Sequence, residues 1–444
     1  MKNIQQEIEE IKDKISNALD LAKSFGVSSA EIAISRQRGL SVSARNGEVE
    51  NVEFNQDGAL GISVYRDGRK GSASTSDLSE DALNRTVKAA CDIAQHTSQD
   101  SCAGLVDEDM LELAPMDLDL YHPKELVPEM GINMAKAAEA AGLAVSDKIA
   151  NSDGASFGGY EGFRVYGNTY GQIVGYPTSR YSLSCGLIAQ GDNEMQRDSQ
   201  YTINRCFDKL RDPAEVGKEA GLAAVAKLNA RKINTIKAPV IFRAEVASSL
   251  FSHLVSAIGG GSLYRKSSFL LDKIETQVMA SNITIHEDPH QLRGLASSPF
   301  DSEGSKTIAM DVVSDGVLNT YLLASYAARK LNLKSTGHAG GIHNWQVLST
   351  MGDLASMAKT MGKGMIVTEL MGQGVNVVNG DYSRGAAGFW VENGEIQYPV
   401  SEVTIAGNLS DIFMNIVGCG SDVDLRGNVQ TGSVLIEEML IGGS

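Results

Sequence analysis

Histidines with neighbouring carboxylates are the residues of this 444-residue chain with most potential for metal or acid–base chemistry. Of its seven histidines only His286 and His290 stand four residues apart, and Glu287 and Asp288 lie between them. On a helix this spacing places two imidazoles on one face, as in zinc-binding helices. Pro289 and the β-type run before His286 argue against a helix. We therefore expect a solvated loop after a strand and no metal site from this pair.

A polar, glycine-dense segment at residues 335–345 carries two more histidines. His338 and His343 lie on either side of Gly340 and Gly341, and Asn344 and Trp345 follow directly. Glycine-rich backbone can lend N–H groups to a ligand, and long loops often carry function. We consider His338, His343, Asn344 and Trp345 a candidate loop for contact with a ligand or partner, the alternative being a flexible connection.

Three other motifs are weaker candidates. Ser156 lies in a Gly-x-Ser-x-Gly pattern, but it lacks the preceding buried strand and following helix that expose a nucleophilic serine, so a glycine-rich turn is expected. Gly259–Gly261 lacks the Lys-Ser/Thr ending of a phosphate-binding loop, which favours a helix end. Cys419 is a lone thiol with no basic partner that the sequence can assign, which favours a packing role.

Composition excludes several classes of function. The 39 Lys and Arg residues against 55 Asp and Glu residues give a net charge of −16, which repels nucleic-acid phosphates and anionic lipids. The five cysteines are scattered without a C-x-x-C pair, which disfavours disulfide scaffolds and cysteine-type zinc sites and favours a reducing cytoplasm. No apolar run approaches the ~20 residues of a membrane span. We expect no signal peptide, no nucleic-acid binding and no membrane attachment.

Helices and short strands alternate in the first half of the sequence. Apolar residues recur on one helical face from Ile4 to Ala22, and Gly26 is placed to end that helix. A β meander is expected over residues 31–76, with turns at Asn46-Gly47, Asp57-Gly58 and Asp67-Gly68. Further helices are expected at residues 79–95, 128–142 and 213–230, with strands between 150 and 190. This repeat of helix and meander leaves a divergent internal duplication open, without a residue-level repeat.

The second half of the sequence has a different pattern and mostly predicts β-strands. A buried strand at Val240–Phe242 and a helix at residues 244–258 open it, and hairpin turns are expected at Asp315-Gly316 and Asn393-Gly394. A final strand covers residues 434–441. We predict an α+β fold with two domains. Residues 1–235 form a helix-plus-antiparallel-meander domain, and residues 236–444 form a β-rich, barrel-like domain.

A long segment near the C-terminus resembles a known family. The runs TELMGQGVN at 368–376 and GDYSRGAAGFW at 380–390, continued through residues 392–409, are similar to the signature of the PmbA (TldE) proteins. These belong to the wider TldD/PmbA family of metallopeptidases. The resemblance covers essentially the whole chain.

The resemblance implies a division of labour between two kinds of subunit. The TldD kind resembles a zinc metallopeptidase with a His-Glu-x-x-x-His helix and a C-terminal cysteine ligand, and the PmbA kind is its partner. The implied heterodimer is cytosolic and acts on unfolded peptides, in leader removal from microcin-type antibiotics and in degradation of a labile antitoxin. The older name, modulator of DNA gyrase, describes the antibiotic's target.

The helix that would bind zinc has lost its ligands here. Aligned on the family pattern, Ser252 and Ala257 replace the two ligand histidines, His253 replaces the catalytic glutamate, and Cys419 lies near the cysteine ligand. A hydroxyl and a methyl group cannot replace two imidazoles, and a neutral histidine cannot simply replace the carboxylate. The resemblance thus implies no catalytic residue and no cofactor in this chain, with zinc in the TldD-type partner.

Three functional hypotheses follow. The leading one is a non-catalytic partner subunit of a zinc-dependent peptidase, which binds extended peptide as an added strand. The second is an independent metal-dependent hydrolase with a relocated site, built from His286, His290, His338 or His343 with Glu287 or Asp288. The third is a peptide-binding module without cleavage. Whether the isolated chain forms a homodimer stays open.

Overall fold

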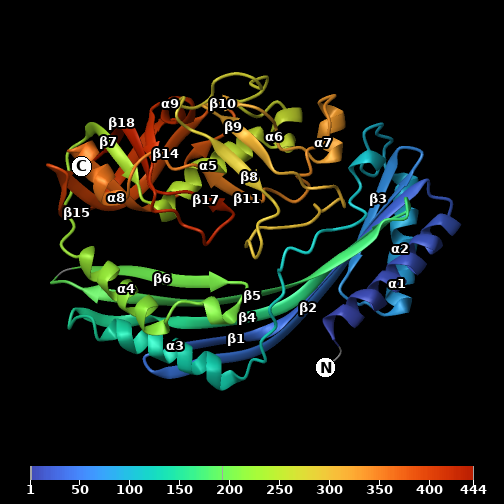
Figure 1. Cartoon of the computed structure of the whole chain (residues 1–444), viewed down its shortest axis with the longest axis horizontal. Helices are drawn as coiled ribbons and strands as arrows, with labels where there is room; N and C mark the ends of the chain where they lie inside the picture. Colours follow the sequence, from blue (N-terminus) through green and yellow to red (C-terminus); the bar gives the residue numbers. More distant parts are fainter. Residues whose placement is uncertain (1–2, 193, 444) are drawn as a thin grey trace.

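Six long antiparallel strands form the N-terminal half of the protein (Figure 1). The computed structural model describes residues 3–192 and 194–443. The strand order is β3-β2-β1-β4-β5-β6. The bounds are β1 Ser29–Arg45, β2 Glu48–Arg66, β3 Arg69–Thr75, β4 Ile149–Asn168, β5 Ile173–Gln190 and β6 Met195–Asn204.

Two of the three expected turns of the first meander are confirmed. Asn46-Gly47 and Asp67-Gly68 connect the strands, and all four residues have positive φ, as tight hairpin turns require. The turn expected at Asp57-Gly58 is wrong. Those residues continue β2 and pair with Gln37 and Arg36 of β1, because the long cross-strand pairing satisfies their backbone groups.

Four helices cover one face of this sheet: α1 Ile4–Ser24, α2 Glu80–His96, α3 Pro128–Leu143 and α4 Pro213–Ala226. On β1, Ile32 and Ile34 pack in the core beneath α1 and α2, whereas Leu40 and Val42 pack beneath α3. The even-numbered β1 residues therefore face the helices throughout. The order α1-β1-β2-β3-α2 is repeated as α3-β4-β5-β6-α4 around the central β1–β4 pair, which supports the duplication that the sequence left open.

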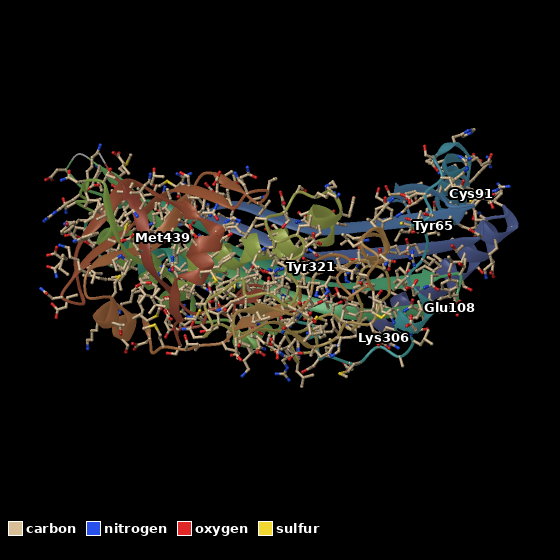
Figure 2. All side chains as sticks on the ribbon, turned by 90° about the horizontal axis from the view of Figure 1, so that it is seen from above. Tyr65, Cys91, Glu108, Lys306, Tyr321 and Met439 are labelled. Carbon is tan, nitrogen blue, oxygen red and sulfur yellow. The ribbon has the colours of Figure 1, made fainter. Side chains whose placement is uncertain are left out.

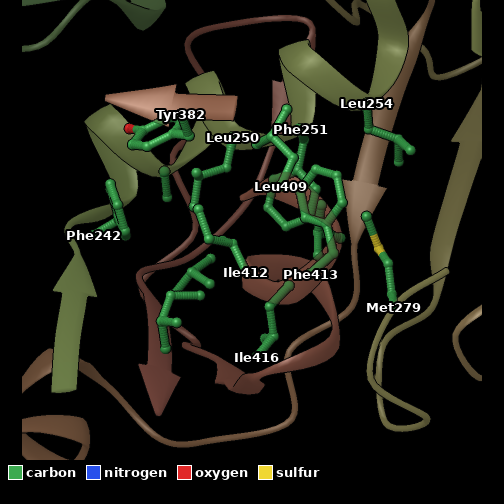
Figure 3. Close-up of a cluster of buried hydrophobic side chains, with 14 of the residues drawn as sticks. Phe242, Leu250, Phe251, Leu254, Met279, Tyr382, Leu409, Ile412, Phe413 and Ile416 are labelled. Carbon is green, nitrogen blue, oxygen red and sulfur yellow. The ribbon is translucent and has the colours of Figure 1, made fainter. Parts of the chain in front are cut away.

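The C-terminal half contains a closed barrel, as predicted. Its strands are β7 Ile236–Phe242, β12 Gly364–Met371, β14 Asp381–Glu392, β15 Glu395–Asn408 and β18 Val434–Gly442. Pairing runs β12-β7-β18-β15-β14 and returns from β14 to β12. The helix α5, Ala244–Ile258, packs Leu250, Phe251 and Leu254 into a large apolar core with Phe413 (Figure 3). The turn at Asn393-Gly394 joins β14 to β15 as expected.

A second sheet of short strands lies beside the barrel. Its order is β10-β9-β8-β11-β17, with β8 Ile285–Asp288, β9 Met310–Ser314, β10 Val317–Leu318, β11 Asn344–Val347 and β17 Val429–Gln430. The hairpin expected at Asp315-Gly316 joins β9 to β10. Shorter elements complete the domain: α6 Gly260–Tyr264, α7 Ser325–Lys330, α8 Leu354–Met361, α9 Leu409–Met414, β13 Val375–Asn376 and β16 Ile416–Cys419.

The C-terminal domain lies against the sheet face that the helices leave uncovered (Figure 1). Arg205, Arg164 and Tyr176 of the N-terminal sheet bond to the loop between β8 and β9, at Leu295, Ser302 and Ser298 respectively. Seen from above, the end of the sheet near Tyr65 and Cys91 extends away from the barrel region near Met439 (Figure 2). Within the described residues, no helix has the length and apolarity needed to cross a membrane.

Candidate functional site

A buried glutamate, Glu287, lies at the centre of the most chemically dense cluster in the C-terminal domain. Its two carboxylate oxygens accept four hydrogen bonds. His338 Nε2 is 2.8 Å from Oε2 and His343 Nδ1 is 2.8 Å from Oε1. The indole Nε1 of Trp345 donates at 2.7 Å and the backbone N–H of His343 at 2.6 Å. We call Glu287, His338, His343 and Trp345 the Glu287 cluster.

Strand register and loop geometry bring this cluster together. Antiparallel pairing of β8 with β11 sets Glu287 opposite Trp345. The glycines of the preceding loop, Gly340 and Gly341, have φ of +102° and +123°, which only glycine adopts readily. Thr336 Oγ1 lies 2.8 Å from His338 Nδ1 and so orients that ring from its other side. The glycine-dense segment is thus an ordered loop that delivers two imidazoles to one carboxylate.

The carboxylate of Glu287 is held in its charged form. Burial by itself would raise its pKa, but the hydrogen bonds and charges of His338 and His343 outweigh that effect and lower the pKa to about 2. A buried charge of this kind is tolerated only where hydrogen bonds replace its lost hydration. The four donors around Glu287 provide that replacement.

The same three residues have the composition of a metal site. One donor atom each from Glu287, His338 and His343 lies within 4.8 Å of the others. Two imidazoles and a carboxylate are a ligand set found in catalytic zinc sites. A cavity of about 210 Å³, lined by His338, Gly341 and the glycines that open α6, provides access from one side. The cluster therefore forms a closed hydrogen-bond network whose donor set is also one that metal ions take.

The sequence-predicted candidates are only partly brought together. His338 and His343 meet at Glu287, and Asn344 and Trp345 are buried beside them, with the Asn344 amide bonded to Ser297 and to the Asp288 carbonyl. The four side chains thus face inward, so contact with a partner through this loop stays a prediction for its exposed glycines. The loop expected at His286 is wrong, because His286 and Glu287 lie within strand β8, whose pairing with β11 satisfies their backbone. The two histidines have separate partners: His286 bonds Asp311 and His290 bonds Thr307.

The α5 site, which we define as Ser252, His253 and Ala257 with the facing Tyr382 and Arg384 of β14, has a different character. Ser252 is exposed and its hydroxyl donates to the Ser248 carbonyl at 2.9 Å. Ala257 is fully buried. Cys419 is also fully buried, which raises the pKa of its thiol to about 12. This donor set does not fit a zinc ion.

Polar atoms without partners mark the α5 site. His253 packs edge-on against Tyr382, with ring centroids 5.9 Å apart, and Tyr382 lies directly against α5 (Figure 3). Within the described residues, His253 Nε2, the Tyr382 hydroxyl and Arg384 Nε are buried without a hydrogen-bond partner. Burial lowers the pKa of His253, and the charge of Arg384 adds to this effect. Burial raises the pKa of Tyr382 to about 12.

Neither of the two remaining motifs forms the site that its pattern suggests. Ser156 lies in the middle of β4 between Ser43 of β1 and Ser184 of β5, so the glycine-rich turn expected there is wrong. Gly259–Gly261, expected to end a helix, ends α5 and immediately begins α6.

Comparison with known proteins relates the N-terminal and the C-terminal domain to one family. The PmbA/TldA metallopeptidase models match in three parts: domain 1 at residues 30–94, the central domain at 121–228 and the C-terminal domain at 235–443. The chain is 54% identical to Metalloprotease PmbA of Escherichia coli O157:H7, covering 98% of this chain and 96% of that one. It is 51% identical to a Metalloprotease PmbA homolog of Haemophilus influenzae, covering 98% and 97%.

Solved structures agree at the level of the whole fold. A structure from Bacteroides thetaiotaomicron, named for modulation of DNA gyrase, superposes with a TM-score of 0.93 at 28% identity, covering 98% of this chain and 99% of that one. TldE from Thermococcus kodakarensis superposes with a TM-score of 0.85 at 20% identity, covering 97% and 100%, which concerns the fold alone.

The fold and the matched domains define a protein of the metallopeptidase type, with a helix-covered meander followed by a barrel. Within that class, the chain belongs to the PmbA/TldE family.

Proposed function

We propose that this chain is the non-catalytic subunit of a zinc-dependent peptidase, active as a heterodimer with a TldD-type subunit. The observation that carries the proposal is the donor set of α5. Where a peptidase of this family would need two imidazoles, a serine bonded to its own helix and a buried alanine occupy the positions. This chain is also similar to a TldD-type protein, a Metalloprotease TldD homolog of Buchnera aphidicola, at 20% identity.

The proposed substrate is unfolded peptide, processed in the cytoplasm. Five free cysteines, none of them paired, agree with a reducing compartment. Leader removal from microcin-type antibiotics and turnover of a labile antitoxin are the proposed physiological roles. The chain's own contribution would be to bind extended peptide beside the zinc centre of its partner.

Co-purification tests this proposal. The chain, tagged and isolated from its own cytosol, should elute with a paralogue that carries His-Glu-x-x-x-His, with zinc, and with the ability to cleave an unstructured peptide. The separated TldD-type subunit should lose most of that cleavage and regain it when this chain is added back. Undiminished cleavage by the TldD-type subunit alone would overturn the proposal.

A second function, an independent metal-dependent hydrolase, has one specific observation in its favour. The donor atoms of Glu287, His338 and His343 lie within 4.8 Å of one another beside a cavity. In that case the purified chain should retain stoichiometric zinc after dialysis, measured by plasma mass spectrometry. His343→Ala should abolish retention, whereas His290→Ala, a histidine outside the cluster, should leave it unchanged. A metal-free chain after dialysis against zinc would exclude this function.

A further inference from the structure

A cavity of about 500 Å³ lies on the face of the N-terminal sheet that the helices leave uncovered. Its walls come from β1, β2, β4 and β5, together with Leu295 of the C-terminal domain. On β1 the odd-numbered residues Ser35 and Gln37 line it, opposite to the even-numbered residues that pack beneath the helices. The cavity is therefore placed where the C-terminal domain sits over the sheet (Figure 1).

Three arginines line this cavity without a carboxylate partner among the described residues. Arg205 is buried and donates to the carbonyls of Gly294, Leu295 and Ser179. Arg164 donates to the Ser302 hydroxyl at 2.7 Å. Arg180 is exposed, and within the described chain it has no hydrogen bond or ion pair. Three guanidinium charges thus share one cavity without neutralisation by a bonded acid.

The other charged residues of the lining leave this excess in place. Arg36 pairs with Glu7 of α1 at 3.4 Å, and Glu161 pairs with Arg38 at 2.7 Å, so these two are engaged elsewhere. Asp57 is the one further acid of the lining, and it is exposed. The cavity is locally cationic on a protein whose net charge is −16. Burial lowers the pKa of Arg205, and the nearby charge of Arg180 adds to this effect.

We propose that this cavity binds a carboxylate of an extended peptide, with Arg180 as the principal contact and Arg164 in support. The inference rests on the proposed peptide-binding function and adds a preference for acidic segments. A guanidinium can hold a carboxylate through two parallel hydrogen bonds, and Arg180 has all of its donors free for this. The charge of the fixed neighbour Arg205 adds attraction in a partly desolvated site. A peptide that lies along the sheet would then be recognised by one acidic group that occupies the cavity.

Direct binding to the full chain tests the inference without the partner. The probes are a fluorescently labelled unstructured peptide rich in glutamate and the same peptide with glutamine throughout, compared by anisotropy. Arg180→Gln should weaken binding of the acidic peptide about tenfold, the loss of one charge-assisted contact, and leave the neutral peptide unchanged. Asp57→Asn should strengthen binding of the acidic peptide, because it removes an opposing charge from the lining.

Arg197→Gln is the matched control. It removes the same charge from an exposed position on β6 outside the cavity, where Arg197 forms a loose ion pair with Asp153 at 3.8 Å. It should change binding by less than about twofold, as expected for screened surface charge. Equal losses from Arg180→Gln and Arg197→Gln would overturn the inference, as would equal affinity for the two peptides.

Two further comparisons separate the sources of the carboxylate and the two proposals. Amidation of the peptide's C-terminus weakens binding if the cavity takes a terminal carboxylate, and has no effect if it takes glutamate side chains. Normal co-purification with a TldD-type subunit but no acidic preference would overturn the cavity inference alone. Acidic preference in the binding assay, together with failure of any TldD-type subunit to co-purify, would overturn the heterodimer alone.

Discussion

The Glu287 cluster and the α5 site are both buried polar regions of one domain, yet they treat their polar atoms in opposite ways. At Glu287 a single carboxylate accepts four hydrogen bonds, and His338 is also bonded on its other ring nitrogen. At α5, His253 Nε2, the Tyr382 hydroxyl and Arg384 Nε are buried without a hydrogen-bond partner in the described chain. An unmade buried hydrogen bond costs about 1–3 kcal/mol, so the first region stabilises the fold and the second weakens it.

The difference lies in how many of the buried polar atoms have hydrogen-bond partners. Helix α5 has an apolar core but no convergent donor set, which agrees with the proposed non-catalytic role. In the short second sheet, an ionic hydrogen-bond network holds a glycine-rich loop. The Glu287 cluster and the α5 site therefore differ in whether their buried polar atoms are hydrogen-bonded, and not only in the types of residue they contain.

The largest expected effect comes from Glu287→Gln. An amide in this position places an NH₂ group against several donors and removes the charge that they surround. The free energy of unfolding should fall by about 3–5 kcal/mol, as for a broken buried ion pair. The measurement is denaturant unfolding. Asp311→Asn, which removes the exposed partner of His286 on the neighbouring strand, should cost less than about 1 kcal/mol. Similar losses in the two variants would remove the contrast between a buried network and a surface pair.

The sequence predicts the secondary-structure elements of the C-terminal domain better than the side-chain cluster that they position. Helix α5 matches its predicted bounds, because apolar periodicity and the following glycines are local signals. The sequence places Glu287 beside His286 and offers it as a carboxylate for any of four histidines, but it does not specify which of them it meets. Its real partners lie more than fifty residues away, and they meet it through the register of β8 against β11. Such pairing depends on tertiary structure, which no local pattern specifies.

The two wrong turns have a related physical cause. Asp57-Gly58 and the Gly154–Gly158 segment are typical of turns locally, but both lie inside long strands. Asp57-Gly58 pairs with β1, and Gly154–Gly158 lies in β4 between β1 and β5. Pairing beyond the segment overrides the local preference of glycine. The sequence does not predict the cationic cavity either, because its three arginines lie on two different strands and at the end of a third. Only the observation that alternate residues of a strand share a face could have grouped them.

A smaller effect of opposite sign is expected from Tyr382→Phe. The Tyr382 hydroxyl is buried without a partner, so its removal should raise the free energy of unfolding by about 1 kcal/mol. Tyr181→Phe is the matched control, since that equally buried hydroxyl donates to the His122 carbonyl at 2.8 Å. Its removal should lower the free energy of unfolding by a similar amount. Destabilisation by Tyr382→Phe would show that the α5 site is as well satisfied as the Glu287 cluster and would end the comparison.

The smallest expected effect concerns the protonation of His253. Its pKa lies below the ordinary value of 6.5, chiefly through burial and secondarily through the charge of Arg384. The folded state therefore binds a proton at this ring less readily than the unfolded state. As the pH falls below about 6.5, protonation of the unfolded state lowers the free energy of unfolding. Above that pH, His253 is neutral in both states and contributes no such loss. Resonances of the His253 ring, followed by NMR, should titrate below 6.5 in the folded chain. Arg384→Gln should move the midpoint part of the way back, whereas Lys237→Gln, which removes an exposed charge from β7, should not move it. A midpoint at or above 6.5 would mean that His253 has an anionic or hydrogen-bonding partner, and the α5 site would then have to be regarded as a second satisfied network.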